Sequence, residues 1–148
     1  MNKYLIIISI CFAMVLLACS GTIPKGIHVD KPSDIIDVLI EKYKNGDKYD
    51  DLASISKGKL QQNIDIIAKK HYKYIITTNP QKIYTEINDK EPILADNQKM
   101  YGIMSSFAKA GSSQLKLGEY FKGYVIINHN KDTDTYYISE FAIHDEKK

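Results

Sequence analysis

The chain has 148 residues, of which 44% are apolar and 26% charged, the composition of an ordinary soluble protein with room for one domain. All 20 basic residues are lysines, and they oppose 18 acidic residues, so the net charge is only +2. Such a balance does not indicate a nucleic-acid-binding protein. Without arginine, bidentate guanidinium contacts to phosphates, carboxylates or base edges are also excluded.

The first 18 residues have the pattern of an export signal. Lys3 precedes an apolar run from Tyr4 to Leu17, which is shorter than the about 20 apolar residues of a membrane-spanning helix. The run ends in Leu16–Leu17–Ala18–Cys19, which resembles a bacterial lipobox. This resemblance implies that residues 1–18 are removed and that Cys19 carries the lipid, of diacylglyceryl and palmitate type. The alternative is an ordinary secretory signal in which Cys19 has no special role.

Several expectations follow from the lipobox. Cys11 would be lost with the signal peptide and Cys19 would be blocked, so no disulfide is expected. Ser20 replaces the aspartate that retains enteric lipoproteins in the inner membrane. We therefore expect a cell-envelope protein, in the outer membrane facing the periplasm if the host has two membranes. Residues 19–30 contain two glycines and a proline, which indicates a flexible tether between the lipidated cysteine and the domain.

Residues 31–71 have the spacing of helices. Asp30–Asp34 is typical of a helix start, and Gly46 of a helix end. Between them, apolar residues recur three and four apart, on one helical face: Ile35, Ile36, Leu39, Ile40 and Tyr43. A second, short helix is predicted over residues 49–55. A third begins at Ser56 and presents Leu60, Ile64, Ile67, Ala68 and His71 on one side.

The rest of the chain favours strands. β-branched and aromatic runs predict strands over residues 72–78, 83–87, 114–117, 120–128 and 135–143, with a polar turn at 128–134. Residues 96–111 fit a helix or a strand, and both interpretations stay open. We therefore predict a single α+β domain over residues 31–148, in which N-terminal helices pack on a curved, mainly antiparallel sheet.

Part of this pattern resembles small bacterial lipoproteins with a cystatin-like roll, the superfamily also called nuclear transport factor two-like. The matching segments are Pro32–Ile36, Tyr43–Tyr49, Leu52–Ser56 and the closing Asp134–Ser139. The resemblance implies a cone-shaped roll that encloses an apolar pocket. Members of the superfamily serve as isomerases, dehydratases, ligand binders and interaction modules, so the fold does not decide the function.

Few residues point to catalysis or to metal binding. Among the histidines, only His71 lies on a predicted apolar face, where it is either a base in the pocket or a helix-end histidine that contacts backbone carbonyls. The alternating oxygens of Asn128, Asn130, Asp132 and Asp134 lack the glycine and glutamate of a calcium loop, which favours a plain hairpin turn. No metal, cofactor or catalytic residue is predicted.

Tyrosine is over-represented: there are 11, of which only Tyr4 precedes Cys19. Tyrosine suits pocket linings and interfaces, although it also covers half-buried sheet faces. The candidate ligand- or partner-binding residues are Tyr120, Tyr124, Tyr136, Tyr137 and His71. We expect a non-catalytic lipoprotein, attached to the membrane by its lipid, that binds a protein or a small apolar ligand and no nucleic acid. The alternatives are an immunity or inhibitor lipoprotein against a toxin, and a pocket enzyme of isomerase or dehydratase type.

Overall fold

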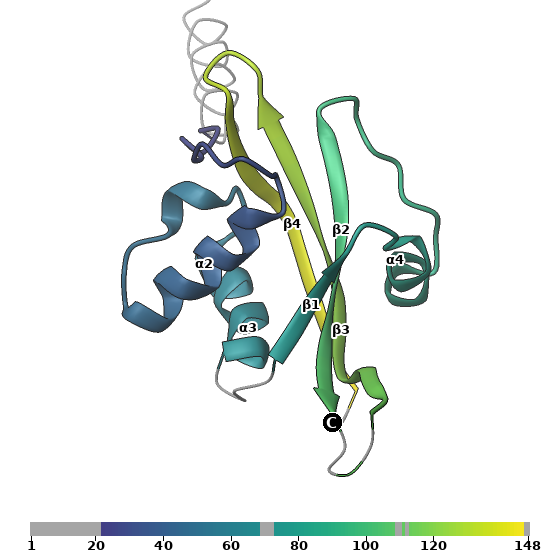
Figure 1. Ribbon diagram of the computed structural model, residues 1–148. Coiled ribbons are helices and arrows are strands. Elements are labelled where there is room, and N and C mark those ends of the chain that lie inside the picture. Colours follow the sequence, from purple (N-terminus) through teal and green to yellow (C-terminus); the bar gives the residue numbers. More distant parts are fainter. Residues whose placement is uncertain (1–21, 69–72, 109–110, 112, 147–148) are drawn as a thin grey trace, which may run out of the picture.

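A computed structural model describes residues 22–68, 73–108, 111 and 113–146. Within them the chain forms a four-stranded sheet in the order β1–β2–β3–β4, and every neighbouring pair is antiparallel. The strands are β1 (Lys73–Thr77), β2 (Gln98–Ala108), β3 (Leu115–Asn130) and β4 (Thr135–Asp145). Helices α2 (Asp34–Asn45) and α3 (Lys57–Ala68) lie on one side of the sheet, and α4 (Gln81–Asn88) lies on the other (Figure 1). The predicted α+β class is therefore confirmed.

Helix α2 forms where its apolar spacing predicts it. Ile35, Ile36, Leu39 and Ile40 are all buried on the face that meets the sheet. The helix ends at Gly46, whose φ of 76° is the left-handed conformation that glycine adopts without strain. The short helix predicted next is a single 3-10 turn, η1 (Asp50–Leu52), and α3 follows directly.

The strand predicted over residues 83–87 is wrong, because this segment belongs to helix α4. Pro80 precedes the helix, and Asp89 ends it with a φ of 52°. In a helix, Ile83, Tyr84 and Ile87 share one face. On the α4 side of the sheet, Tyr84 forms a small apolar cluster with Met100, Tyr124 and Ile126, and Ile87 packs against this cluster. Burial of one helical face outweighs the strand propensity of a short β-branched run.

Residues 96–111, for which helix and strand were both open, contain strand β2. Tyr101 and Ile103 pack in the main core under α2 and α3, whereas Met100 packs on the side of α4. This alternation has the period of two that a strand requires. A glycine fits at position 102 of β2, because a Cβ there would lie only 2.6 Å from the Thr77 side chain of β1.

The outer edge of β4 is covered by three segments that are distant in sequence. Ile27 exchanges two backbone hydrogen bonds with Tyr136, at 3.0 and 2.8 Å, and the Ser54 N–H donates to the Ile138 carbonyl at 2.9 Å. The side-chain amide of Asn63 in α3 pairs with the strand further along. Residues 25–27, which fall in the predicted tether, are thus attached to the folded domain.

The space between the sheet and helices α2 and α3 is filled by side chains. Apolar residues from both layers meet there with an exposed fraction of 2% or less, among them Leu39, Ile64, Ile103, Phe121 and Val125. The resemblance implied an apolar pocket in this place. Instead, packed side chains occupy it among the described residues, and one opening lies at the end of the sheet near the β3–β4 turn.

Candidate functional site

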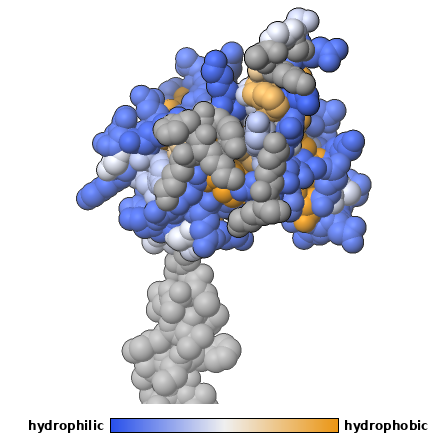
Figure 2. All heavy atoms as spheres, turned by 90° about the horizontal axis from the view of Figure 1, so that it is seen from below, coloured by the Kyte–Doolittle hydropathy of each residue, from blue (hydrophilic) through white to orange (hydrophobic). Residues whose placement is uncertain are grey.

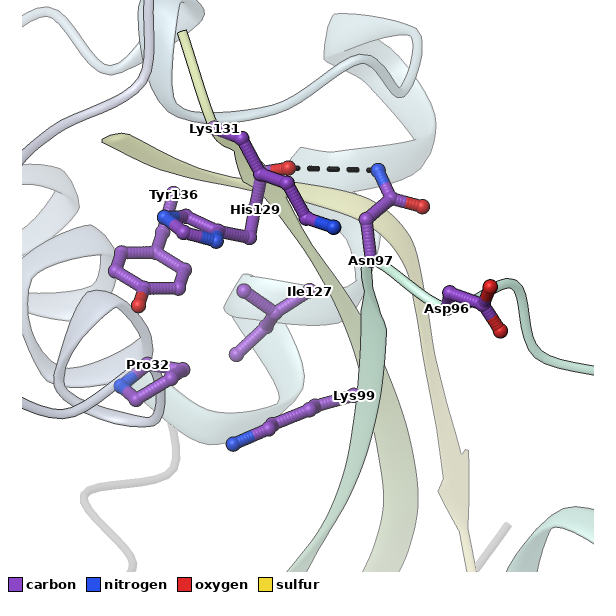
Figure 3. A pocket seen from close by; sticks show the side chains of 8 residues that line it. All are labelled: Pro32, Asp96, Asn97, Lys99, Ile127, His129, Lys131 and Tyr136. Carbon is purple, nitrogen blue, oxygen red and sulfur yellow. Dashed lines mark hydrogen bonds between the residues drawn. The ribbon is translucent and has the colours of Figure 1, made fainter. Parts of the chain in front are cut away.

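This opening, which we call the mouth, has a volume of about 120 Å³. It lies where the start of α2 meets the ends of β2, β3 and β4. The lining residues are Pro32, Asp96, Asn97, Lys99, Ile127, His129, Lys131 and Tyr136 (Figure 3). Ile127 is buried and forms an apolar floor, while the other residues add aromatic and polar walls. The mouth therefore offers one small apolar surface inside a polar rim.

One wall is an aromatic pair held in a fixed orientation. The rings of His129 and Tyr136 stack with centroids 4.6 Å apart and planes 16° from parallel. The His129 Nε2 lies 2.9 Å from the Asp134 Oδ1, and its backbone N–H donates to the Asn97 carbonyl at 2.8 Å. His28 also contacts Asp134, through a Nδ1 that lies 3.0 Å from the backbone carbonyl oxygen. These contacts hold the His129–Tyr136 pair in one orientation.

The rim carries two lysines. In Figure 3 the side chains of Lys99 and Lys131 extend on opposite sides of Ile127, whereas the carboxylate of Asp96 is directed away from the opening. Within the described part of the chain, neither ammonium group has a carboxylate within ion-pair distance. Both lysines are exposed, so their positive charges are available to a group that enters the mouth.

A second, wider depression of about 370 Å³ adjoins the mouth. It shares Asn97, His129 and Lys131 with the mouth and is lined in addition by Ile23, Asn130, Asp132 and Tyr137. Tyr136 and Tyr137 are consecutive residues of β4, so their rings lie on opposite faces of the sheet. The β3–β4 end of the sheet is thus hollowed on both sides of its last two strands.

The four candidate tyrosines do not form one surface. Tyr136 and Tyr137 lie at the mouth end, as described. Tyr120 contacts Phe107 in a tilted arrangement, with ring centroids 5.0 Å apart, toward the opposite end of the sheet. Tyr124 is 1% exposed beneath α4, where its hydroxyl donates to Glu140 and accepts from the Asn88 amide at 3.1 Å. His71 and Cys19 lie outside the described residues.

The hydroxyl of Tyr124 is held protonated. Burial raises the pKa of this phenol above its ordinary value, and the hydrogen bond to the Glu140 carboxylate raises it further. A buried, hydrogen-bonded phenol of this kind ties α4 to the sheet. We therefore assign Tyr124 to the packing of α4 and not to ligand binding.

The mouth contains residues that were not among the candidates, notably Asn97, Lys99, His129 and Lys131. The turn between β3 and β4 pairs Asn130 with Thr135, and therefore His129 with Tyr136. That register could have been derived from the predicted polar turn, because directly paired residues of antiparallel strands share a face. The position of Asn97 and Lys99 beside His129 could not have been derived in this way, since it depends on the pairing of β2 with β3.

A separate cluster of charges lies between α4 and the C-terminal end of β4. The Lys122 Nζ is 2.7 Å from Glu86 and 2.9 Å from Glu146, and His144 lines the same cavity of about 160 Å³. The hydrogen bond from Lys122 lowers the pKa of Glu86, and the bond to Glu86 in turn raises the pKa of Lys122. With both carboxylates already paired to one ammonium group, this arrangement joins three segments of the fold.

Among the described residues, no group of three or more histidine, cysteine, aspartate or glutamate side chains could hold a metal ion. No helix in this part of the chain is long and apolar enough to cross a membrane. Seen from the end opposite the mouth, the surface is largely hydrophilic, with small separate apolar areas (Figure 2). The mouth is therefore the most developed candidate for a binding site.

Comparisons of this chain with models of protein families, with curated proteins and with solved structures gave no match.

Proposed function

We propose that the protein is a cell-envelope lipoprotein, anchored through Cys19, whose domain works by binding a partner protein at the mouth and not by catalysis. The observation that carries the proposal is the filled space between the sheet and helices α2 and α3. Sites that enclose a small molecule usually have about 300–1,000 Å³. The mouth, at about 120 Å³, accommodates a single side chain, and the adjoining depression of about 370 Å³ is open to the surface and does not enclose a molecule. This favours a protein partner over a captured apolar molecule.

The chemistry of the mouth supports the same proposal. Neither a serine nor a cysteine lines it, so the usual pairing of a nucleophile with a base is missing from the lining residues. His129 is stacked on Tyr136 and held by Asp134, which makes the pair a rigid platform. Rigid aromatic surfaces with a polar rim are typical of the centre of a protein interface.

The proposed anchor would lie close to this site. The chain is attached to the sheet from Lys25 onward, because the Thr135 hydroxyl donates to the Lys25 carbonyl at 3.0 Å and the Gly26 N–H donates to the Asp51 carbonyl at 2.9 Å. Five residues lie between Cys19 and Lys25, and this segment spans at most about 20 Å when fully extended. The mouth end of the domain would then face the membrane, and the partner would be reached near its surface.

The anchor is tested by Cys19→Ser in the native host, with metabolic labelling by a palmitate analogue and fractionation of the envelope. We expect the wild type to be labelled and shortened, and the variant to be unlabelled and uncleaved. Equal membrane attachment and equal processing of both proteins would contradict the lipobox assignment.

The binding function is tested by chemical cross-linking in cells, followed by affinity purification of the full-length, lipidated protein and mass spectrometry. We expect one protein partner in near-stoichiometric amount. Recovery of a small apolar molecule without any protein partner would contradict the proposal and favour ligand capture.

A further inference from the structure

We infer that the mouth binds the carboxylate of a glutamate side chain presented by the partner. This inference rests on the proposed function and specifies its chemistry. It starts from the arrangement of charges around Ile127. Lys99 and Lys131 stand at the rim on opposite sides of this floor residue, and neither ammonium group has an ion-pair partner among the described residues (Figure 3).

The nearby acidic groups are directed elsewhere. The carboxylate of Asp96 turns away from the opening (Figure 3). Asp134 is occupied by two histidines, since its Oδ1 lies 2.9 Å from the His129 Nε2 and its Oδ2 lies 3.4 Å from the His28 Nδ1. The two lysines thus supply the positive charge in the lining of the mouth that is not paired with a carboxylate of the described residues. An anionic group gains from both, and a neutral or cationic group does not.

The size of the mouth selects a carboxylate at the end of a short apolar stem. A volume of about 120 Å³ holds about four water molecules at ~30 Å³ each, which is enough for the end of one side chain. The methylene groups of a glutamate would contact Ile127 and the face of the His129–Tyr136 pair, while its carboxylate would reach the ammonium groups. The Asn97 side-chain amide, which also lines the mouth, donates one N–H to the His129 carbonyl at 3.4 Å, and its second N–H can donate to the same carboxylate.

The test uses the full-length, lipidated protein in phospholipid nanodiscs with ¹³C-labelled isoleucine methyl groups. The probe is N-acetyl-glutamate methylamide, and N-acetyl-glutamine methylamide is its neutral control. We expect the Ile127 methyl signals to shift saturably with the glutamate probe and to stay in place with the glutamine probe. Ile93 is 94% exposed and lies outside the mouth, so its signals should not respond to either probe.

The double variant Lys99→Gln/Lys131→Gln should weaken binding of the glutamate probe at least tenfold. The matched control, Lys73→Gln/Lys90→Gln, removes two exposed charges away from the mouth and should leave binding unchanged. Equal shifts with both probes, no shift of Ile127, or equal losses in the two double variants would overturn the inference. If the probe fails while in-cell cross-linking still recovers a protein partner, the carboxylate assignment is wrong and the proposed function stands.

Discussion

Asn63 in α3 accepts a hydrogen bond from the backbone N–H of Ile143 in β4, at 2.8 Å and across 80 residues of sequence. Its side-chain amide also donates to the Phe141 carbonyl at 2.9 Å. One asparagine therefore satisfies a donor and an acceptor on the outer edge of β4, as a neighbouring strand would do. An unprotected edge strand exposes such groups to other chains, so this contact both holds α3 on the sheet and covers part of the β4 edge.

Replacement of Asn63 by alanine should destabilise the fold, because two backbone groups of β4 lose their partners. We expect a loss of about 1–3 kcal/mol. The change should appear as a lower midpoint in urea unfolding at an unchanged slope. Gln62→Ala is the matched control, since Gln62 is exposed on the same helix and should change the midpoint little. Equal midpoints for the two variants would contradict this role of Asn63.

Gly26→Ala should release the N-terminal segment from β4. Gly26 has a φ of 67°, and an added Cβ would lie 2.6 Å from the Tyr136 carbonyl oxygen. The left-handed backbone alone costs a non-glycine residue about 1–2 kcal/mol. We expect faster hydrogen exchange at the Ile27 and Tyr136 amides. The control is Gly58→Ala in α3, where an added Cβ meets no atom within 4 Å, and exchange at the same two amides should not change.

Ser105→Ala should weaken the junction between β2 and β3. The pairing of these strands shifts between Met104 and Ser106, and the buried Ser105 hydroxyl accepts hydrogen bonds from the Tyr120 and Phe121 N–H groups, at 3.1 and 3.3 Å. Ser105→Ala removes these two hydrogen bonds from a buried site, at a cost of about 1–3 kcal/mol. The free energy of unfolding measures this effect. Ser106→Ala, at the neighbouring and more exposed position, should cost much less.

The ion pairs of Lys122 should make stability depend on pH in a predictable direction. The pKa of Glu86 is lowered in the folded state, so its contribution is present above its usual pKa of 4.5 and is lost as the pH falls through the folded-state value. The pKa of Lys122 is raised, so its contribution is present below 10.5 and is lost as the pH rises through the folded-state value.

The difference in melting temperature between the wild type and Lys122→Gln should therefore be largest near neutral pH and should shrink toward acid and alkali. The exposed residue Lys90 provides the control variant Lys90→Gln, whose melting temperature should follow the wild type throughout. A difference that stays constant from pH 3 to 11 would show that Lys122 acts through packing alone.

Tyr124→Phe should reduce stability without affecting the mouth. The variant loses the hydrogen bond to the Glu140 carboxylate, and hydrogen bonds to charged groups contribute about 1.5–3 kcal/mol. Binding of the glutamate probe, followed at the Ile127 methyl group, should be unchanged. Lost binding at full stability would instead place Tyr124 in the binding site.

The sequence predicted correctly those elements in which the apolar spacing repeats several times along the helix or strand. Helix α2 has four buried residues on one face and a glycine at its end, so propensity, period and capping agree. Helix α4 has only eight residues, too few for its period to outweigh the β-branched isoleucines and Tyr84. That this segment is a helix depends on the packing of Tyr84 against Tyr124, which lies 40 residues further along the chain.

The site was less accessible to prediction than the fold. Tyr136 and Tyr137 were expected from composition, and both line depressions at the mouth end. Their partners Asn97 and Lys99 come from a segment whose secondary structure was open, and only the pairing of β2 with β3 brings them there. Sequence period specifies which face a residue occupies, whereas a site depends on register between strands.

Site-specific photo-cross-linking in living cells tests the central claim most directly. A photoreactive phenylalanine derivative would replace Asp132, which is exposed beside the mouth and leaves both rim lysines in place, or Leu115, which is 64% exposed near the opposite end of the sheet. We predict that the reagent at position 132 captures a single protein partner and that the reagent at position 115 does not. Capture of the same protein only from position 115 would show that the domain binds through its other end and that the mouth is not the site.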